Sequence, residues 1–221
     1  MTALDILWDY RQAFLGGLLT TAELVLVPAF ASTLIAIALE WLCGIAGAPF
    51  RRALDSITFC AAAIPALVVL FWFHYPAQAM LGIVIRPFWT ALLTLTLLNT
   101  LAVYRIIADA LRDLPRQFVA TGQVCGMTRA QIVRYIKVPL LFRAALPRWI
   151  DQQVVIFQTS LFASLISVEE TFRVAQRINS QVYRPVTIYT AMAILFLVTA
   201  GSAMYYARQL RLKYYRDFSE R

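Results

Sequence analysis

Residues 116–147 read RQFVATGQVCGMTRAQIVRYIKVPLLFRAALP, a segment too charged to cross a membrane and too regular to be an unstructured loop. This segment predicts two short helices joined at Gly126. The first helix covers about 116–125. We expect Gly126 to end it, because glycine adopts the left-handed conformation of a helix cap without steric cost.

The second helix is expected to begin at Thr128. Thr128 and Gln131 form a capping-box pattern, in which each side chain satisfies a backbone N–H group of the other residue. Pro139 is expected to end this helix, because a proline ring cannot continue the helical hydrogen bonding. The first helix is rich in small residues, namely Ala120, Thr121 and Gly122. Small side chains let another chain approach closely, so a short helix of this kind is suited to docking into another protein.

Long apolar stretches flank this segment on both sides. A helix needs about 20 mostly apolar residues to cross the hydrocarbon core of a bilayer. Five stretches qualify, at residues 14–42, 57–73, 88–111, 150–166 and 186–206. Pro28 and Pro65 fall inside the first two stretches and are expected to kink them. The predicted fold is an all-α integral membrane protein with five transmembrane helices, forming a single domain over residues 1–221.

The composition agrees with a membrane protein. Hydrophobic residues make up 61% of the chain and charged residues 14%, against roughly 45–50% and 25% in soluble domains. The net charge of +8 is spread between apolar blocks and does not form one basic stripe. We therefore expect contact with a lipid membrane and no nucleic-acid partner.

The distribution of Lys and Arg predicts the orientation. Fourteen of these residues fall in the connections at 51–52, 112–148 and 208–221, whereas five fall in the connections on the opposite side. Because cytoplasmic connections carry the excess of positive charge, we expect a cytoplasmic loop at 112–148 and a cytoplasmic basic tail at 207–221. The N-terminus is then outside and the C-terminus inside.

The connection at 168–185 is expected to lie outside the membrane and to contain a short helix. Its apolar residues recur at helical spacing, and Glu169 stands four residues before Arg173, a favourable helix pair. Such a helix serves either as an interfacial connector or as a surface for protein docking.

The chain lacks the residue patterns of a metal site or an enzyme. Cys43, Cys60 and Cys125 show no metal-ligand spacing, and His74 is the only histidine. The sequence contains no G-x-x-x-x-G-K-[ST] motif for nucleotide phosphates. We predict no catalytic residues, no metal and no directly bound cofactor.

The segment 116–147 resembles the signature loop of bacterial ABC-transporter permeases. Gly126 followed after nine residues by Ile136, Val138 and Pro139 is similar to their G-x9-I-x-L-P pattern. Ala120, Thr121 and Gly122 occupy the Glu-Ala-Ala positions of that loop, without its Glu. Further segments resemble the polar amino-acid uptake (histidine/glutamine-type) subgroup, in the same order along the chain: 17–21, 65–71, 164–170, 175–176 and 183–185.

This resemblance implies a permease subunit of a type I ABC importer in the bacterial inner membrane, with a cytoplasmic coupling helix. Such permeases pair as homodimers or heterodimers, receive solute from a periplasmic binding protein, and dock on ATPase subunits that hold the ATP and Mg²⁺. The residues expected at the ATPase contact are Ala120, Thr121, Gly122, Gly126, Met127 and Pro139.

Arg105 is the least expected residue in an apolar span. A charge at membrane depth is costly unless it is paired or wet, so Arg105 is a candidate for the solute pathway. In the alternative interpretation, Arg105 pairs with Asp109 one turn away and extends toward the cytoplasm. The residues that we expect along the pathway are Arg105, Asp109, Gln158, Ser160 and Pro65.

This chain differs from the family at several polar positions. Arg105 stands where the family usually has a Glu, and Ala62 and Ala108 stand where it has Arg. Two hypotheses follow. In the first, which we favour, this chain is the non-binding half of a heterodimer. In the second, it recognises an anionic solute through Arg105, because a guanidinium binds a carboxylate through two hydrogen bonds.

We predict half of the translocation pathway for an amino acid or a related small polar solute, coupled to the ATPase through residues 116–137. The alternatives are a membrane scaffold that does not transport and a membrane enzyme subunit.

Overall fold

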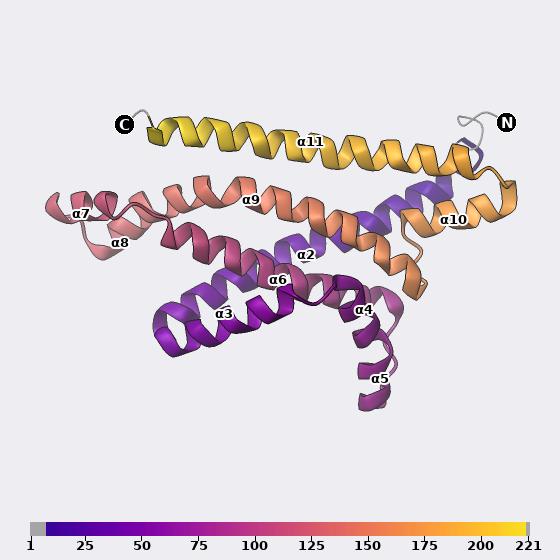
Figure 1. Ribbon diagram of the computed structural model, residues 1–221, viewed down its shortest axis with the longest axis horizontal. Coiled ribbons are helices and arrows are strands. Elements are labelled where there is room, and N and C mark those ends of the chain that lie inside the picture. Colours follow the sequence, from indigo (N-terminus) through magenta and orange to yellow (C-terminus); the bar gives the residue numbers. More distant parts are fainter. Residues whose placement is uncertain (1–7, 220–221) are drawn as a thin grey trace.

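The computed structural model describes residues 8–219, and in that range every regular element is a helix (Figure 1). Three helices are long and apolar enough to cross a bilayer: α2 (Arg11–Ala46), α6 (Pro87–Arg112) and α11 (Pro185–Ser219). They correspond to the first, third and fifth predicted spans. α2 continues unbroken through Pro28.

The second predicted span is broken in the structure. α3 (Ala48–Ala62) ends before Pro65, and the chain resumes as α4 (Ala66–His74) and α5 (Pro76–Leu81) after a bend of 95°. The kink predicted at Pro65 is therefore confirmed, and it is sharp enough to divide the stretch 57–73 between two helices. Pro65 has no N–H group to donate, and its ring disfavours helical geometry at the preceding residue.

The fourth predicted span belongs to a longer helical run. It comprises α8 (Arg129–Ile132), the π-helix η1 (Val133–Lys137), α9 (Val138–Thr159) and the 3₁₀-helix η2 (Ser160–Ile166). α10 (Thr171–Val182) follows after a bend of 51°. Within the described residues, five crossings result if each of the two bent pairs counts as one span.

α10 confirms the helix predicted in the 168–185 connection, but it packs into the protein. The Oγ1 atoms of Thr21 and Thr171 lie 2.7 Å apart, joining α2 to the start of α10. The side chain of Glu170, fully buried, accepts hydrogen bonds from two backbone N–H groups of the first turn. Glu169 does not pair with Arg173 as predicted. Its carboxylate lies 2.9 Å from Arg177, two turns along the helix.

α6 lies at the centre of the fold. Half of its most apolar segment is buried inside the protein, against 28% for α2 and 17% for α11. The core around α6 includes Leu24, Leu95, Val103, Tyr104 and Ile107. α11 packs along α9 and leaves most of its apolar surface exposed (Figure 1), as a helix that faces lipid or another subunit does.

Residues 207–219 of the predicted basic tail belong to α11. α11 continues through this region as one helix to Ser219. Residues 220–221 of the predicted tail lie outside the described residues.

Candidate functional site

The predicted docking segment forms a helical elbow, which we define as α7 (Arg116–Val124), α8 and η1. Gly126 separates α7 from α8 and has a φ of +75°, which confirms the predicted left-handed helix stop. The N–H of Met127 donates to the carbonyl of Gly122 at 3.0 Å and closes the end of α7. The elbow projects at one end of the molecule, beyond the ends of α6 and α9 (Figure 1).

The predicted capping box at Thr128 is also confirmed. The N–H of Thr128 donates to the Oε1 of Gln131 at 2.8 Å, and the N–H of Gln131 donates to the Oγ1 of Thr128 at 3.3 Å. These two bonds satisfy backbone donors at the start of α8. They hold the turn between α7 and α8 by local interactions.

Pro139 does not end the second helix, so this prediction is wrong. Pro139 lies in the first turn of α9, and the chain stays helical from α8 through η1 into α9. The π-helix η1 explains how the chain stays helical up to Pro139. The N–H of Val138 donates to the carbonyl of Val133, five residues back. This wider turn changes the hydrogen-bond register where the proline has no N–H to donate.

The predicted docking residues divide into an outer and an inner set. Ala120, Thr121, Gly126 and Pro139 are exposed, and Met127 is half-buried. Gly122 is buried and faces the inside of the elbow. A Cβ atom there would lie 2.8 Å from the Cδ1 of Ile136.

The small size of Gly122 therefore serves contact between α7 and η1 rather than contact with another subunit. Val124, which is 88% exposed at the end of α7, was not among the predicted docking residues. Its only signal was its place as an apolar residue among small and polar ones. Ala120, Thr121 and Val124 give the elbow a small, partly apolar outer surface.

A cavity of about 420 Å³ lies between α3, α6 and α9, and we call it the pathway pocket. Arg105 and Asp109, two of the predicted pathway residues, line it. The other polar residues in its wall are Thr58, Arg148, Gln152 and Thr159. Alanines from α3, α4 and α6, including Ala62, make up much of the remaining wall. The pocket is therefore mainly apolar with a few polar groups, as small-molecule sites usually are.

The charges of this pocket are not paired as one interpretation of Arg105 requires. The Oδ1 of Asp109 lies 3.4 Å from the Nη1 of Arg112, and the Oδ2 of Asp55 lies 2.6 Å from the Nη2 of Arg112. Arg112 thus joins α6 to α3. Arg105 is exposed and forms no ion pair with any residue that the structure describes.

The remaining predicted pathway residues lie outside the pathway pocket. Gln158 is exposed on α9 and is not in the pocket wall. Ser160 is buried, and its hydroxyl donates to the carbonyl of Phe157 at 2.8 Å, so it stabilises the end of α9. Pro65 is exposed at the break between α3 and α4 and precedes the pocket residue Ala66.

A buried polar network that the sequence analysis missed holds α2, α6 and α9 together beside the pocket. Asn99, fully buried on α6, donates to the Oγ of Ser32 at 2.7 Å and to the Oε1 of Gln153 at 3.2 Å. Gln152, a pocket residue, donates to the Oδ1 of Asn99 at 3.3 Å. Interhelical hydrogen bonds of this kind fix helix positions inside a membrane. Only the polar character of Asn99 in an apolar stretch could have indicated it.

Comparison with known proteins relates this fold to membrane transport. Residues 36–213 match the family described as binding-protein-dependent transport system inner membrane component. The octopine transport system permease protein of Rhizobium meliloti is 25% identical over 206 residues, covering 86% of this chain and 81% of that protein. The glutamine transport system permease protein of Escherichia coli K12 is 28% identical over 144 residues, covering 65% of each chain.

Solved structures share the fold. A chain from the crystal structure of an amino acid ABC transporter with histidines matches with a TM-score of 0.82 at 21% identity, covering 98% of this chain and 99% of that one. A chain of the inward-facing MetNI methionine ABC transporter matches with a TM-score of 0.74 at 18% identity, covering 92% and 97%. The chain belongs to the binding-protein-dependent transport system inner membrane components and is a permease subunit of that family.

Proposed function

We propose that this chain forms half of the translocation pathway of an ATP-driven importer for amino acids or amino-acid derivatives. In this proposal the elbow docks on a separate ATPase, which binds the ATP and Mg²⁺, and a periplasmic binding protein delivers the solute. A second permease subunit supplies the other half of the pathway. Relatives named for octopine and glutamine transport support this class of solute.

The observation that carries the proposal is the construction of the elbow. Its outer residues Ala120, Thr121 and Val124 are exposed at the end of the molecule. Gly126, the capping box and the inward contact of Gly122 hold the elbow rigid through local interactions. A rigid projection with small side chains fits a groove of another protein and transmits force in both directions.

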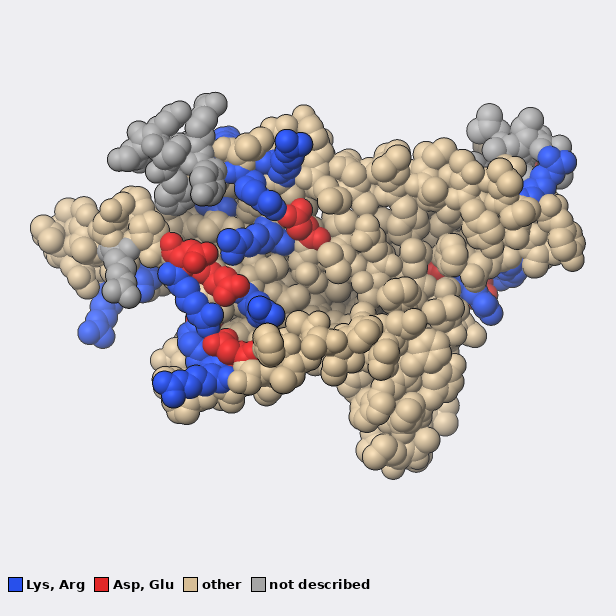
Figure 2. All heavy atoms as spheres, in the orientation of Figure 1, with Lys and Arg blue, Asp and Glu red and all other residues tan. Residues whose placement is uncertain are grey.

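The charge distribution supports a cytoplasmic position for the elbow. Figure 2 shows that, on the face in view, Lys and Arg gather toward the end of the molecule that carries α7 and the C-terminal end of α11. This arrangement follows the excess of positive charge on the cytoplasmic side of membrane proteins. The N-terminus would then face the periplasm.

Arg105 supports a direct contact between this chain and the solute. Its guanidinium lies in the wall of the pathway pocket and has no ion-pair partner among residues 8–219, and Asp109, its predicted partner one turn away, is paired with Arg112. A free guanidinium binds a carboxylate through two hydrogen bonds. Because the pocket wall is mostly apolar around Ala62, we infer that a different permease subunit supplies contacts to the rest of the solute.

The docking proposal is tested by Ala120→Trp on the exposed side of α7. The affinity of this chain for the ATPase, measured by co-purification, should fall roughly fivefold to a hundredfold, because a bulky group in a close-packed contact costs about 1–3 kcal/mol. Ala46→Trp is the matched control, since Ala46 is also exposed, at the last residue of α2. The control should retain the ATPase.

Three results would count against this proposal. Normal ATPase retention and coupled transport in Ala120→Trp would remove the elbow as the docking surface. Wild-type chain that brings down no ATPase would favour a scaffold without transport activity. Turnover of a substrate by the chain alone would favour a membrane enzyme subunit.

A further inference from the structure

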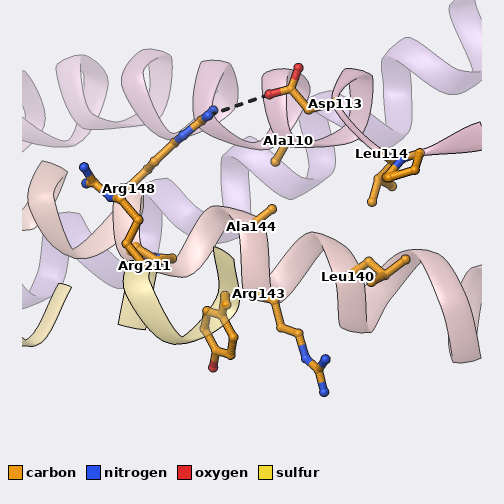
Figure 3. Close-up of a pocket in the computed structure, with 11 residues that line it drawn as sticks. Ala110, Asp113, Leu114, Leu140, Arg143, Ala144, Arg148 and Arg211 are labelled. Carbon is orange, nitrogen blue, oxygen red and sulfur yellow. Dashed lines mark ion pairs between the residues drawn. The ribbon is translucent and has the colours of Figure 1, made fainter. Parts of the chain in front are cut away.

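A second cavity, which we call the basic pocket, lies between α9, the end of α11 and the connection that follows α6. It has a volume of about 300 Å³ and lies outside the pathway pocket, sharing only Arg148 with it. Ala110 and Ala144 point toward each other across it from α6 and α9 (Figure 3). With Leu114, Leu140 and Pro147, these alanines give the basic pocket an apolar wall.

Three arginines line the basic pocket, against one carboxylate. Arg148 lies 3.7 Å from Asp113, the carboxylate in the wall, and this pair is marked in Figure 3. Arg211 forms an ion pair with Asp151. Arg143 has no carboxylate partner among the described residues, and its guanidinium lies 6.0 Å from the centre of the Tyr214 ring. The pocket therefore keeps an excess of positive charge beside apolar surface.

The basic pocket lies where apolar helices end. Arg112 is the last residue of α6, and Asp113 follows it directly. Arg211 follows the apolar stretch of α11 that ends near residue 206, and Arg148 precedes the apolar stretch of α9 that begins near residue 150. In a membrane these residues lie at the level of the lipid headgroups, with the apolar spans below them.

We propose that the basic pocket binds the phosphodiester headgroup of an anionic phospholipid. The Arg143 guanidinium, which has no carboxylate partner among the described residues, would contact the phosphate oxygens, because a guanidinium matches phosphate geometry in two bonds. The acyl chains would lie along the apolar wall. Basic pockets between membrane helices at the cytoplasmic surface are a recurring form of anionic-lipid site.

The apolar wall favours a lipid over a free phosphate ion, which would gain nothing from Ala110, Ala144 and Leu140. A bound lipid would join the connection after α6 to α9 and α11 at the base of the elbow. The inference requires only that these helices cross a bilayer, and it does not depend on the identity of the solute.

The test uses the assembled transporter in mixed micelles with phosphatidylglycerol or phosphatidylcholine, and native mass spectrometry counts the lipid retained per chain. We expect the wild type to retain more phosphatidylglycerol than phosphatidylcholine. In Arg143→Gln, the ratio of retained phosphatidylglycerol to phosphatidylcholine should fall roughly tenfold. Arg52→Gln is the matched control. Arg52 is exposed on α3 and lies outside the basic pocket. Arg52→Gln therefore removes the same positive charge from the chain and leaves the basic pocket unchanged.

Four results would overturn the proposal. The first is equal retention of both lipids by the wild type. The second and third are an unchanged preference for phosphatidylglycerol in Arg143→Gln and an equal loss of that preference in Arg52→Gln. The fourth is displacement of phosphatidylglycerol by millimolar inorganic phosphate, which would indicate a free-phosphate site. If Arg143→Gln instead loses the ATPase and keeps the lipid, the pocket is a protein contact. Thermal unfolding of each variant in detergent, unchanged from wild type, shows that a lost preference does not come from misfolding.

Discussion

Arg105 and Arg112 lie two turns apart on α6 but have different surroundings. Arg112 contacts two carboxylates, Asp55 and Asp109, and joins α3 to α6. Arg105 has no such partner in the described part of the chain and lies in the wall of the pathway pocket. A charged side chain that the fold leaves unpaired at membrane depth must be hydrated or must bind an anion from outside the chain.

We expect Arg105→Gln to weaken solute affinity for transport roughly tenfold or more, because a hydrogen bond to a charged group contributes about 1.5–3 kcal/mol. The measurement is the concentration dependence of uptake by the assembled transporter in proteoliposomes. Arg52→Gln, which removes a charge outside the pocket, should leave the affinity unchanged. If Arg105→Gln also transports with wild-type affinity, the partner permease alone holds the solute.

At the level of helices, three prolines show what the sequence could and could not predict. Pro65 interrupts the helix between α3 and α4. In contrast, α2 continues through Pro28, and the helical run from α8 to α9 continues through Pro139. Gly126 and Thr128 act through bonds within a few residues of themselves, so the local pattern predicted them. The outcome at a proline depends on register changes such as η1 and on packing, which the local pattern does not contain.

Two neighbouring glycines of α2 test how α10 is held. A Cβ on Gly17 would lie 3.0 Å from the Cα of Thr171, whereas a Cβ on Gly16 would meet nothing within 4 Å. Gly17→Ala should therefore lower the stability by about 1–3 kcal/mol, and Gly16→Ala should leave it unchanged or raise it by up to about 1 kcal/mol. The measurement is thermal unfolding in detergent. Equal melting temperatures for the two variants would contradict close packing of α10 on α2.

For the whole molecule, composition and the lengths of the apolar stretches were enough to predict an all-helical membrane protein with five crossings, and the described residues form three to five. Contacts between distant residues were not predictable in this way. Asn99 bonds to Ser32 and Gln153, and the basic pocket joins α9, α11 and the connection after α6. Both depend on which helix faces lie side by side, and a single sequence does not specify that. The same limit applies to Gln158 and Ser160, which lie on the predicted helix but outside the pathway pocket.

The most direct test of the account is labelling of Cys125, an exposed cysteine in the elbow. With Cys60→Ser, Cys125 is the remaining exposed cysteine, because Cys43 is buried. A membrane-impermeant maleimide should label Cys125 in inside-out vesicles that lack the ATPase, and the assembled ATPase should block this labelling. Labelling from outside intact cells, or labelling that the ATPase does not change, would contradict a cytoplasmic elbow that docks on the ATPase.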